Sequence, residues 1–93
     1  MTYDEYKQRH PKRVDQVDGG RYVIEFEDGS KGFLDIDDWC ITYAHYGREF
    51  DNIRLPQPVE INKTMSFIDE SERGFEPCTV STRSRVVDIE FSS

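Results

Sequence analysis

The chain has 93 residues, of which 35% are hydrophobic and 33% are charged, and its formal net charge at pH 7 is −7. This length predicts a single small domain over residues 1–93, and an aromatic fraction of 13% supplies large side chains for a core. The negative charge opposes a phosphate backbone and so disfavours direct nucleic-acid binding, and no apolar run approaches the length of a membrane span.

The N-terminal segment, residues 1–11, is polar and predicts either a short helical turn over Tyr3–Gln8 or a frayed end. It carries no signal-peptide pattern, and two cysteines are few for a secreted domain of this size. We therefore expect a cytoplasmic protein, in a bacterial cell or in the host cytoplasm of a phage. A first strand is expected over Lys12–Val17, with Val14 directed inward and Asp18-Gly19-Gly20 as the following turn.

A β-hairpin over Tyr22–Ile36 is the best-specified element, because apolar and polar residues alternate on both sides of the turn-forming pair Asp28-Gly29. A two-residue turn would place the apolar residues of the two strands on opposite faces. A three-residue turn, Glu27-Asp28-Gly29, places most of them on one face and needs Gly29 in the left-handed region. It also aligns opposite charges across the strands, worth roughly 0.2–1 kcal/mol per pair. The predicted pairs are Arg21 with Asp35, Tyr22 with Leu34, Val23 with Phe33, Ile24 with Gly32, Glu25 with Lys31 and Phe26 with Ser30.

A short helix is predicted over residues 38–46. Asp37 is a favourable N-cap, and Gly47 is well placed to end the helix. Three aromatic residues recur between them at the helical spacing i, i+4, i+7. They are Trp39, Tyr43 and Tyr46. Within the same range, Ile41-Thr42-Tyr43 would also suit a strand.

The rest of the chain predicts more strands. A second hairpin is expected over Val59–Phe67 with its turn at Asn62-Lys63, followed by a charged loop over Asp69–Pro77. A final strand is expected over Arg85–Phe91, where Val87, Ile89 and Phe91 alternate with the residues between them. Together these elements predict an α+β fold, mostly antiparallel β-hairpins with one or two short helices.

Several segments carry a family resemblance, which covers about residues 12–78. They are Arg13-Val14, Tyr22–Phe26, Asp28-Gly29, Leu34-Asp35-Ile36, Phe50 and Val59–Ile61. In these segments the chain resembles the short bacterial proteins known as domain of unknown function 2442. It departs from them because Met65–Asp69 lacks their usual W-P-N-G segment and because its final strand extends further. The resemblance implies a compact α+β fold, no established activity, and a regulatory or toxin–antitoxin role.

No catalytic motif emerges from the residues. Asp35, Asp37 and Asp38 cluster, but nothing predicts the different environments that would separate an acid from a base. They do not fit a calcium-binding loop, since Trp39 follows where that loop needs a glycine. The two histidines and two cysteines lack metal-ligand spacing, and neither a nucleophile motif nor a glycine-rich phosphate loop is present. We therefore expect that the protein is not an enzyme and that it binds no metal and no cofactor.

The candidate binding segment is Asp35–Asp51, with the charged segment Asp69–Glu76 as an additional part. Its partner-binding residues are Asp35, Asp37, Asp38, Trp39, Tyr43, Tyr46, Glu49 and Asp51. Aromatic side chains with a polar rim are typical of interfaces, although these aromatics would equally suit the core.

Carboxylates complement the Lys and Arg residues of a partner. We therefore predict a non-enzymatic, acidic protein-binding module, antitoxin-like or of the phage-inhibitor type, that blocks a basic, nucleic-acid-binding surface of another protein. The alternative is a structural subunit that joins a larger assembly by adding an edge strand, either Arg85–Phe91 or Lys12–Val17.

Overall fold

A computed structural model describes residues 13–70 and 78–92. Within these ranges the chain forms nine strands and no helix, so the predicted α+β class is wrong and the fold is all-β. The strands are β1 (Arg13–Val14), β2 (Gly20–Phe26), β3 (Lys31–Ile36), β4 (Ile41–His45), β5 (Arg48–Phe50), β6 (Ile53–Arg54), β7 (Val59–Glu60), β8 (Thr64–Asp69) and β9 (Cys78–Phe91).

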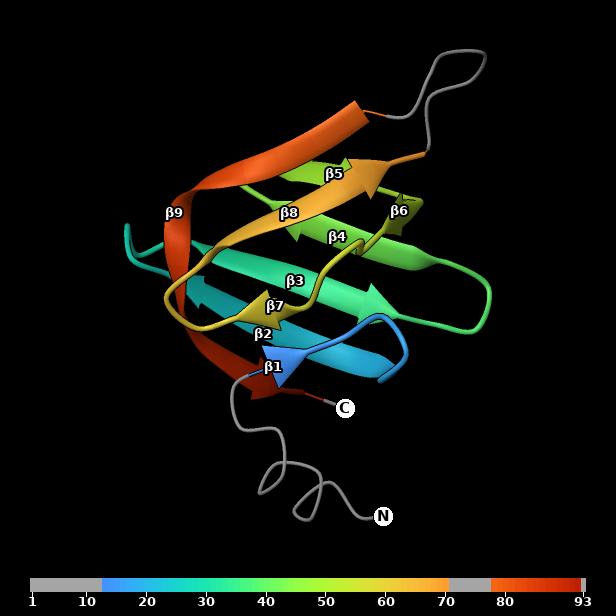
Figure 1. Ribbon diagram of the computed structural model, residues 1–93, viewed down its shortest axis with the longest axis horizontal. Helices are drawn as coiled ribbons and strands as arrows, with labels where there is room; N and C mark the ends of the chain where they lie inside the picture. Colours follow the sequence, from blue (N-terminus) through green and yellow to red (C-terminus); the bar gives the residue numbers. More distant parts are fainter. Residues whose placement is uncertain (1–12, 71–77, 93) are drawn as a thin grey trace.

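Seven of these strands form one antiparallel sheet in the order β5-β4-β3-β2-β9-β8-β6, which curls into a nearly closed barrel (Figure 1). Strand β9 joins the two halves of the barrel, because its second half pairs with β2 and its first half pairs with β8. Beyond β8, strand β6 returns close to β4. Strands β1 and β7 pair with each other as a separate ribbon at one end of the barrel.

The predicted register of the hairpin β2–β3 is confirmed. The observed pairs include Arg21 with Asp35, Tyr22 with Leu34, Val23 with Phe33, Ile24 with Gly32 and Glu25 with Lys31. The Gly29 amide donates to the Phe26 carbonyl at 2.9 Å, and the Phe26 amide donates to the Ser30 carbonyl at 3.0 Å. Gly29 has φ = +87°, as the three-residue turn requires. The two charge pairs form ion pairs, Arg21–Asp35 at 3.4 Å and Lys31–Glu25 at 3.7 Å.

We expect Gly29→Val to destabilise the protein by about 2 kcal/mol, because a β-branched residue is strained in the left-handed region. A Cβ atom at Gly29 would have no atom within 4 Å, so the cost is backbone strain and not a clash. Gly29→Asn is the matched control and should cost less, since asparagine tolerates positive φ. Urea denaturation measures both variants; equal midpoints for Gly29→Val and the wild type would contradict the turn.

The helix predicted over residues 38–46 is wrong, because residues 41–45 form β4. Ile41 and Tyr43 are buried there, and every residue of β4 pairs with one of β3. The chain enters β4 through a turn closed by a 3.1 Å hydrogen bond from the Asp37 amide to the Cys40 carbonyl. It leaves through Tyr46 and Gly47, whose φ values of +54° and +75° form a two-residue hairpin turn into β5. Gly47 therefore lies in a hairpin turn and does not end a helix.

The second predicted hairpin is also wrong in its partners. Strand β7 pairs with β1, placing Val59 against Val14, and β8 pairs with β9. Asn62, in the turn between β7 and β8, adopts φ = +69°, and its amide donates to the Val86 carbonyl of β9 at 2.8 Å, which links this turn to β9. The inward position predicted for Val14 is confirmed, since this side chain is buried.

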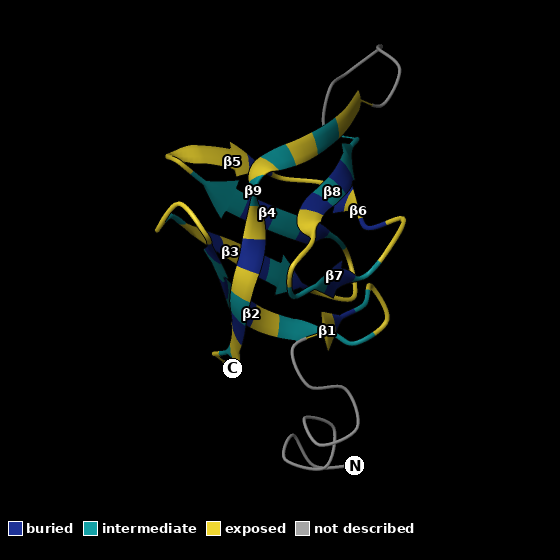
Figure 2. Ribbon diagram, turned by 60° about the vertical axis from the view of Figure 1, so that its left-hand side comes forward, coloured by how far each residue is buried: buried dark blue, intermediate teal, exposed yellow. Residues whose placement is uncertain are grey.

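The final strand is confirmed, but it is longer than expected and contains a bulge. Glu25 pairs with Asp88 while Phe26 pairs with Val86, so Val87 is an extra residue in β9. Val87 is consequently exposed and Val86 is fully buried. Val87 therefore does not share a face with the buried Ile89, although the simple alternation of residues 85–91 predicted that it would. In Figure 2, isolated buried segments of β9 lie between exposed and intermediate ones.

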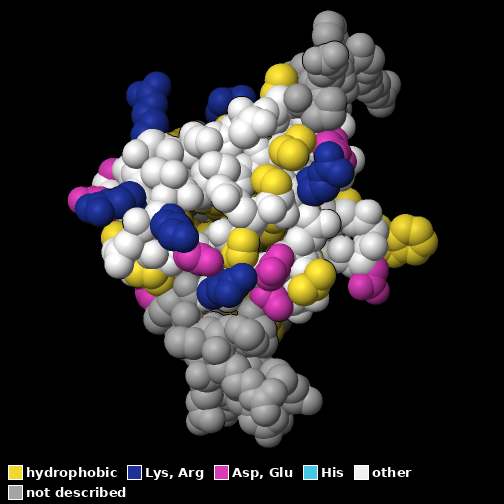
Figure 3. Space-filling model, viewed as in Figure 1, with side chains coloured by type: hydrophobic (Ala, Val, Ile, Leu, Met, Phe, Trp, Pro, Cys, Tyr) yellow, Lys and Arg dark blue, Asp and Glu magenta, His cyan; other side chains and the backbone are white. Residues whose placement is uncertain are grey.

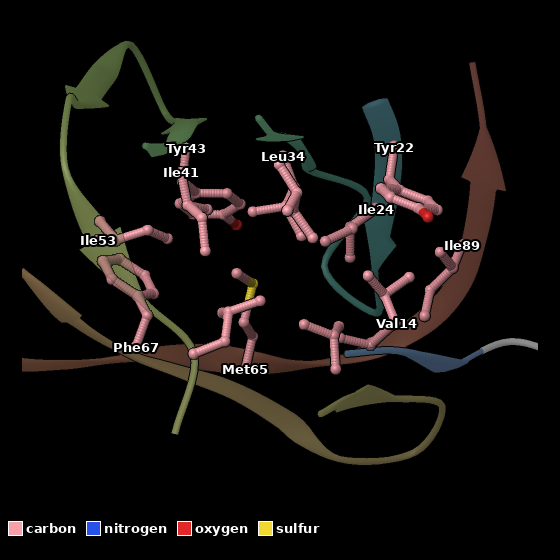
Figure 4. Packing of buried hydrophobic residues seen from close by; sticks show 14 of the residues in the cluster. Val14, Tyr22, Ile24, Leu34, Ile41, Tyr43, Ile53, Met65, Phe67 and Ile89 are labelled. Carbon is pink, nitrogen blue, oxygen red and sulfur yellow. The ribbon is translucent and has the colours of Figure 1, made fainter. Parts of the chain in front are cut away.

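The core lies between the two halves of the barrel. Side chains from β2, β3 and β4 meet those from β1, β6 and β8 (Figure 4). Phe67 contacts two aromatic rings, Tyr43 at a centroid distance of 5.2 Å and Phe50 at 5.0 Å. The Tyr43 ring also covers Gly32, where no side chain competes for the space. Across the described ranges, the chain contains no helix with the length and hydrophobicity needed to cross a lipid bilayer.

Candidate functional site

The acidic residues of the predicted binding segment gather at one end of the sheet, where β3 and β5 end and β4 begins. In the antiparallel register, Asp35 is opposite Thr42 and Phe50 is opposite Tyr43, which brings Asp51 to the same end. The turn between β3 and β4 adds more acidic residues and a tryptophan. We define the acidic surface as Asp35, Asp37, Asp38, Trp39, Glu49 and Asp51.

Trp39 projects from the β3–β4 turn with 92% of its surface exposed. Asp37 shapes this turn, because its carboxylate accepts the Asp38 amide at 2.6 Å. An open groove of about 410 Å³ runs beside Trp39, and the largely exposed Val17 also lines it. In Figure 3, hydrophobic and acidic side chains project together at the right-hand edge, where Figure 1 places this turn. The turn therefore offers a large apolar side chain next to two carboxylates.

The outer face of the sheet continues the acidic surface with a second exposed aromatic, Phe33. Phe33 is 56% exposed and pairs with Val23 on one side and Ala44 on the other. A groove of about 400 Å³ lies over this row, lined by Phe33, Asp35, Thr42, Glu49 and Asp51, among others. Phe33 was not among the predicted partner-binding residues, although the predicted register already placed it outside, opposite Val23.

Most carboxylates of the acidic surface have no ion-pair partner within the described ranges. Asp35 is the exception, since it pairs with Arg21 at 3.4 Å. Those without a partner are Asp37, Asp38, Glu49 and Asp51, and all four are exposed. Their charge is therefore available to Lys or Arg residues of another molecule.

The two tyrosines of the predicted site lie elsewhere. Tyr43 is buried in the core, and burial raises the pKa of its hydroxyl above the usual range. Tyr46 is 68% exposed but sits at the opposite end of β4, stacked on His45 at 4.2 Å. Of the charged segment Asp69–Glu76, only Asp69 and Glu70 lie within the described ranges. Cys40, whose side chain is partly exposed, lines the groove beside Trp39.

A chain of hydrogen bonds runs through His45 at that opposite end. The Tyr43 hydroxyl lies 2.9 Å from Nδ1 of His45, and Nε2 lies 2.8 Å from the Ser30 hydroxyl. Ser30 in turn donates to Asp28 at 2.6 Å. Because the Ser30 proton is given to Asp28, the neutral His45 ring must donate from Nε2 and accept at Nδ1. His45 therefore takes no proton from Ser30, and this arrangement does not activate a serine nucleophile.

Burial and hydrogen bonding set the protonation states of His45 and Asp28 in this chain of hydrogen bonds. Burial lowers the pKa of His45, and the nearby Asp28 carboxylate opposes that shift. The two hydrogen bonds from Ser30 lower the pKa of Asp28. At neutral pH the imidazole of His45 is therefore neutral and the carboxylate of Asp28 is ionised. Elsewhere in the described ranges, no three His, Cys, Asp or Glu residues are close enough together to hold a metal ion.

Comparisons of this chain with protein-family models, with curated proteins and with solved structures returned no match. The resemblance to domain of unknown function 2442 thus stays a prediction. The α+β fold that it implied is replaced by the all-β barrel.

Proposed function

We propose that this protein is a non-enzymatic binding module that docks its acidic surface on a basic surface of a partner protein. The observation that carries the proposal is the 92% exposure of Trp39 beside the carboxylates of Asp37 and Asp38, which are exposed and have no ion-pair partner within the described ranges. The mode of action is that of an antitoxin or phage-type inhibitor: the carboxylates occupy positions where the partner would bind nucleic-acid phosphates. The proposed location is the cytoplasm of a bacterial cell, or of the host if a phage encodes the chain.

Each part of the acidic surface has a distinct physical role in this proposal. Tryptophan is enriched among the residues that dominate binding energies, because it buries a large area at low entropic cost. The surrounding carboxylates accelerate encounter with a basic partner and select against acidic ones. Phe33 extends the apolar contact along the sheet, while Glu49 and Asp51 surround it with negative charge.

The experiment is an affinity capture from the native cell, followed by binding measurements with the captured partner at 50 to 500 mM salt. We expect the affinity to fall as salt rises, because screening weakens attraction between exposed charges. The double charge reversal Asp37→Lys/Asp38→Lys should weaken binding by at least tenfold. Trp39→Ala should weaken it about thirtyfold, the equivalent of about 2 kcal/mol for a dominant interface residue.

The matched control is Glu27→Lys/Glu60→Lys, which changes the net charge by the same amount at two sites outside the acidic surface. Glu27 lies in a surface ion pair with Arg85, and Glu60 lies in surface ion pairs with Lys63 and Arg13; such pairs contribute little to stability. Equal loss of binding in both double variants would mean that only net charge matters. Unchanged binding in Asp37→Lys/Asp38→Lys and in Trp39→Ala would exclude the acidic surface.

The alternative, a subunit that joins an assembly by adding an edge strand, either Arg85–Phe91 or Lys12–Val17, stays a second proposal. Residues 86–91 of β9 pair with β2, and β1 pairs with β7, so within the described ranges each of these segments has one strand neighbour. A proline at Ile89, a buried residue opposite Ile24, would unfold the barrel and could not test association.

A further inference from the structure

The sheet does not close between β5 and the first half of β9, and a groove of about 420 Å³ is lined by residues of both strands. From the β4–β5 hairpin, His45, Tyr46 and Arg48 line this groove. From β9, Ser81, Arg83 and Ser84 line it. The buried ring of Phe67 contributes to its floor. It is distinct from the acidic surface, which lies at the other end of β4.

Among the described residues, each strand that borders the groove has one edge without a strand partner. Strand β5 pairs only with β4, and Thr79–Ser81 of β9 pair only with β8. The other edge of each strand leaves backbone amides and carbonyls without a strand partner. An extended peptide can hydrogen-bond to such an edge, and the neighbouring side chains then select its sequence.

The charges at the groove differ from those of the rest of the surface. The described ranges contain eight Lys and Arg residues, and six of them form ion pairs. The remaining two are Arg48 and Arg83, and both line this groove. Arg48 is held over the Phe50 ring at 5.1 Å, which orients its guanidinium without neutralising it. Asp28, the carboxylate at the groove, already accepts two hydrogen bonds from Ser30.

We infer that this groove binds a short extended peptide that carries carboxylate side chains, with the peptide backbone along a free strand edge and its carboxylates on Arg48 and Arg83. Guanidinium groups bind carboxylates in bidentate geometry. The stacked rings of His45 and Tyr46 provide an apolar wall for the side chains between the carboxylates. A nucleic-acid strand fits less well, because its phosphates continue past the groove onto an acidic protein of net charge −7.

The test is a titration of the isotope-labelled full chain, followed by NMR. The probe is an acetylated, amidated hexapeptide of alternating Glu and Thr, which places its carboxylates on one side of an extended chain. We expect amide shifts in β5 and in the first half of β9. Arg48→Gln and Arg83→Gln should each weaken binding at least fivefold. Arg54→Gln, which removes an arginine from an ion pair with Glu70 outside the groove, should bind as the wild type does.

Two further probes complete the test. The same hexapeptide with Lys in place of Glu should bind at least tenfold more weakly, and a thymidine hexanucleotide should not compete. The inference is overturned if the Glu peptide causes no shifts at millimolar concentration, or if the arginine variants bind it unchanged. It is equally overturned if the Lys peptide or the oligonucleotide binds as tightly. The Asp37→Lys/Asp38→Lys variant should bind the Glu peptide at least as tightly as the wild type, which separates this site from the acidic surface.

Discussion

Phe67→Ala is expected to lower the free energy of unfolding by about 3–5 kcal/mol. Phe67 is buried and contacts the rings of Tyr43 and Phe50. Its removal loses both the transfer energy of the ring and the packing around the space that it leaves. A domain of this length has a total stability of roughly 5–14 kcal/mol, so this single change removes a large share of it.

Phe33→Ala is the matched control for Phe67→Ala, because it removes the same side chain from the outer face of the barrel. Phe33 is 56% exposed, so its loss should cost less than about 1 kcal/mol. Chemical denaturation with a shared slope for all variants measures the difference. Similar midpoints for Phe67→Ala and Phe33→Ala would contradict the core described above.

Gly32→Ala is expected to destabilise the protein by about 1–3 kcal/mol, although alanine is the smallest side chain that can be introduced. An added Cβ would lie 2.7 Å from Cε1 and 2.8 Å from Cζ of Tyr43. The Tyr43 ring cannot retreat easily, since it packs against Phe67 and its hydroxyl is hydrogen-bonded to His45. The expected destabilisation is therefore steric, because the Tyr43 ring of the neighbouring strand β4 occupies the space that the added Cβ would need.

A double-mutant cycle with Tyr43→Leu identifies the cause. Leucine removes the atoms nearest to the added Cβ, so Gly32→Ala should cost less in the Tyr43→Leu protein than in the wild type. Urea denaturation of the four proteins gives the coupling free energy. The same cost for Gly32→Ala in both backgrounds would show that the strain arises from the backbone and not from the ring.

The hairpin β2–β3 was predictable to the residue because its determinants are local. The turn needs a glycine at positive φ, and one register alone agrees with both the apolar face and the charge pairs. The exposure of Phe33 follows from that register as well. The proposed binding surface could thus be predicted in part from the same alternation that specified the strand pairing.

The structure of residues 38–46 could not be predicted from the local sequence pattern alone. The spacing of Trp39, Tyr43 and Tyr46 satisfies a helix, but pairing with β3 buries Ile41 and Tyr43 on one face of a strand. The same three aromatics then separate: one projects from a turn, one enters the core and one stacks at a hairpin end. Helical periodicity over so short a segment is weaker than the hydrogen bonds and burial gained from a neighbouring strand.

By itself, then, the sequence determined the hairpin, the inward position of Val14 and a cluster of carboxylates around residues 35–51, because each rests on neighbours in the chain or on one turn. Only the tertiary structure decided the all-β class, the partners of β7 and β8 and the bulge at Val87. The tertiary structure alone also places Arg48 and Arg83, which are 35 positions apart in sequence, at one groove. These features depend on closing the barrel, in which long-range strand pairing and shared burial outweigh local preference.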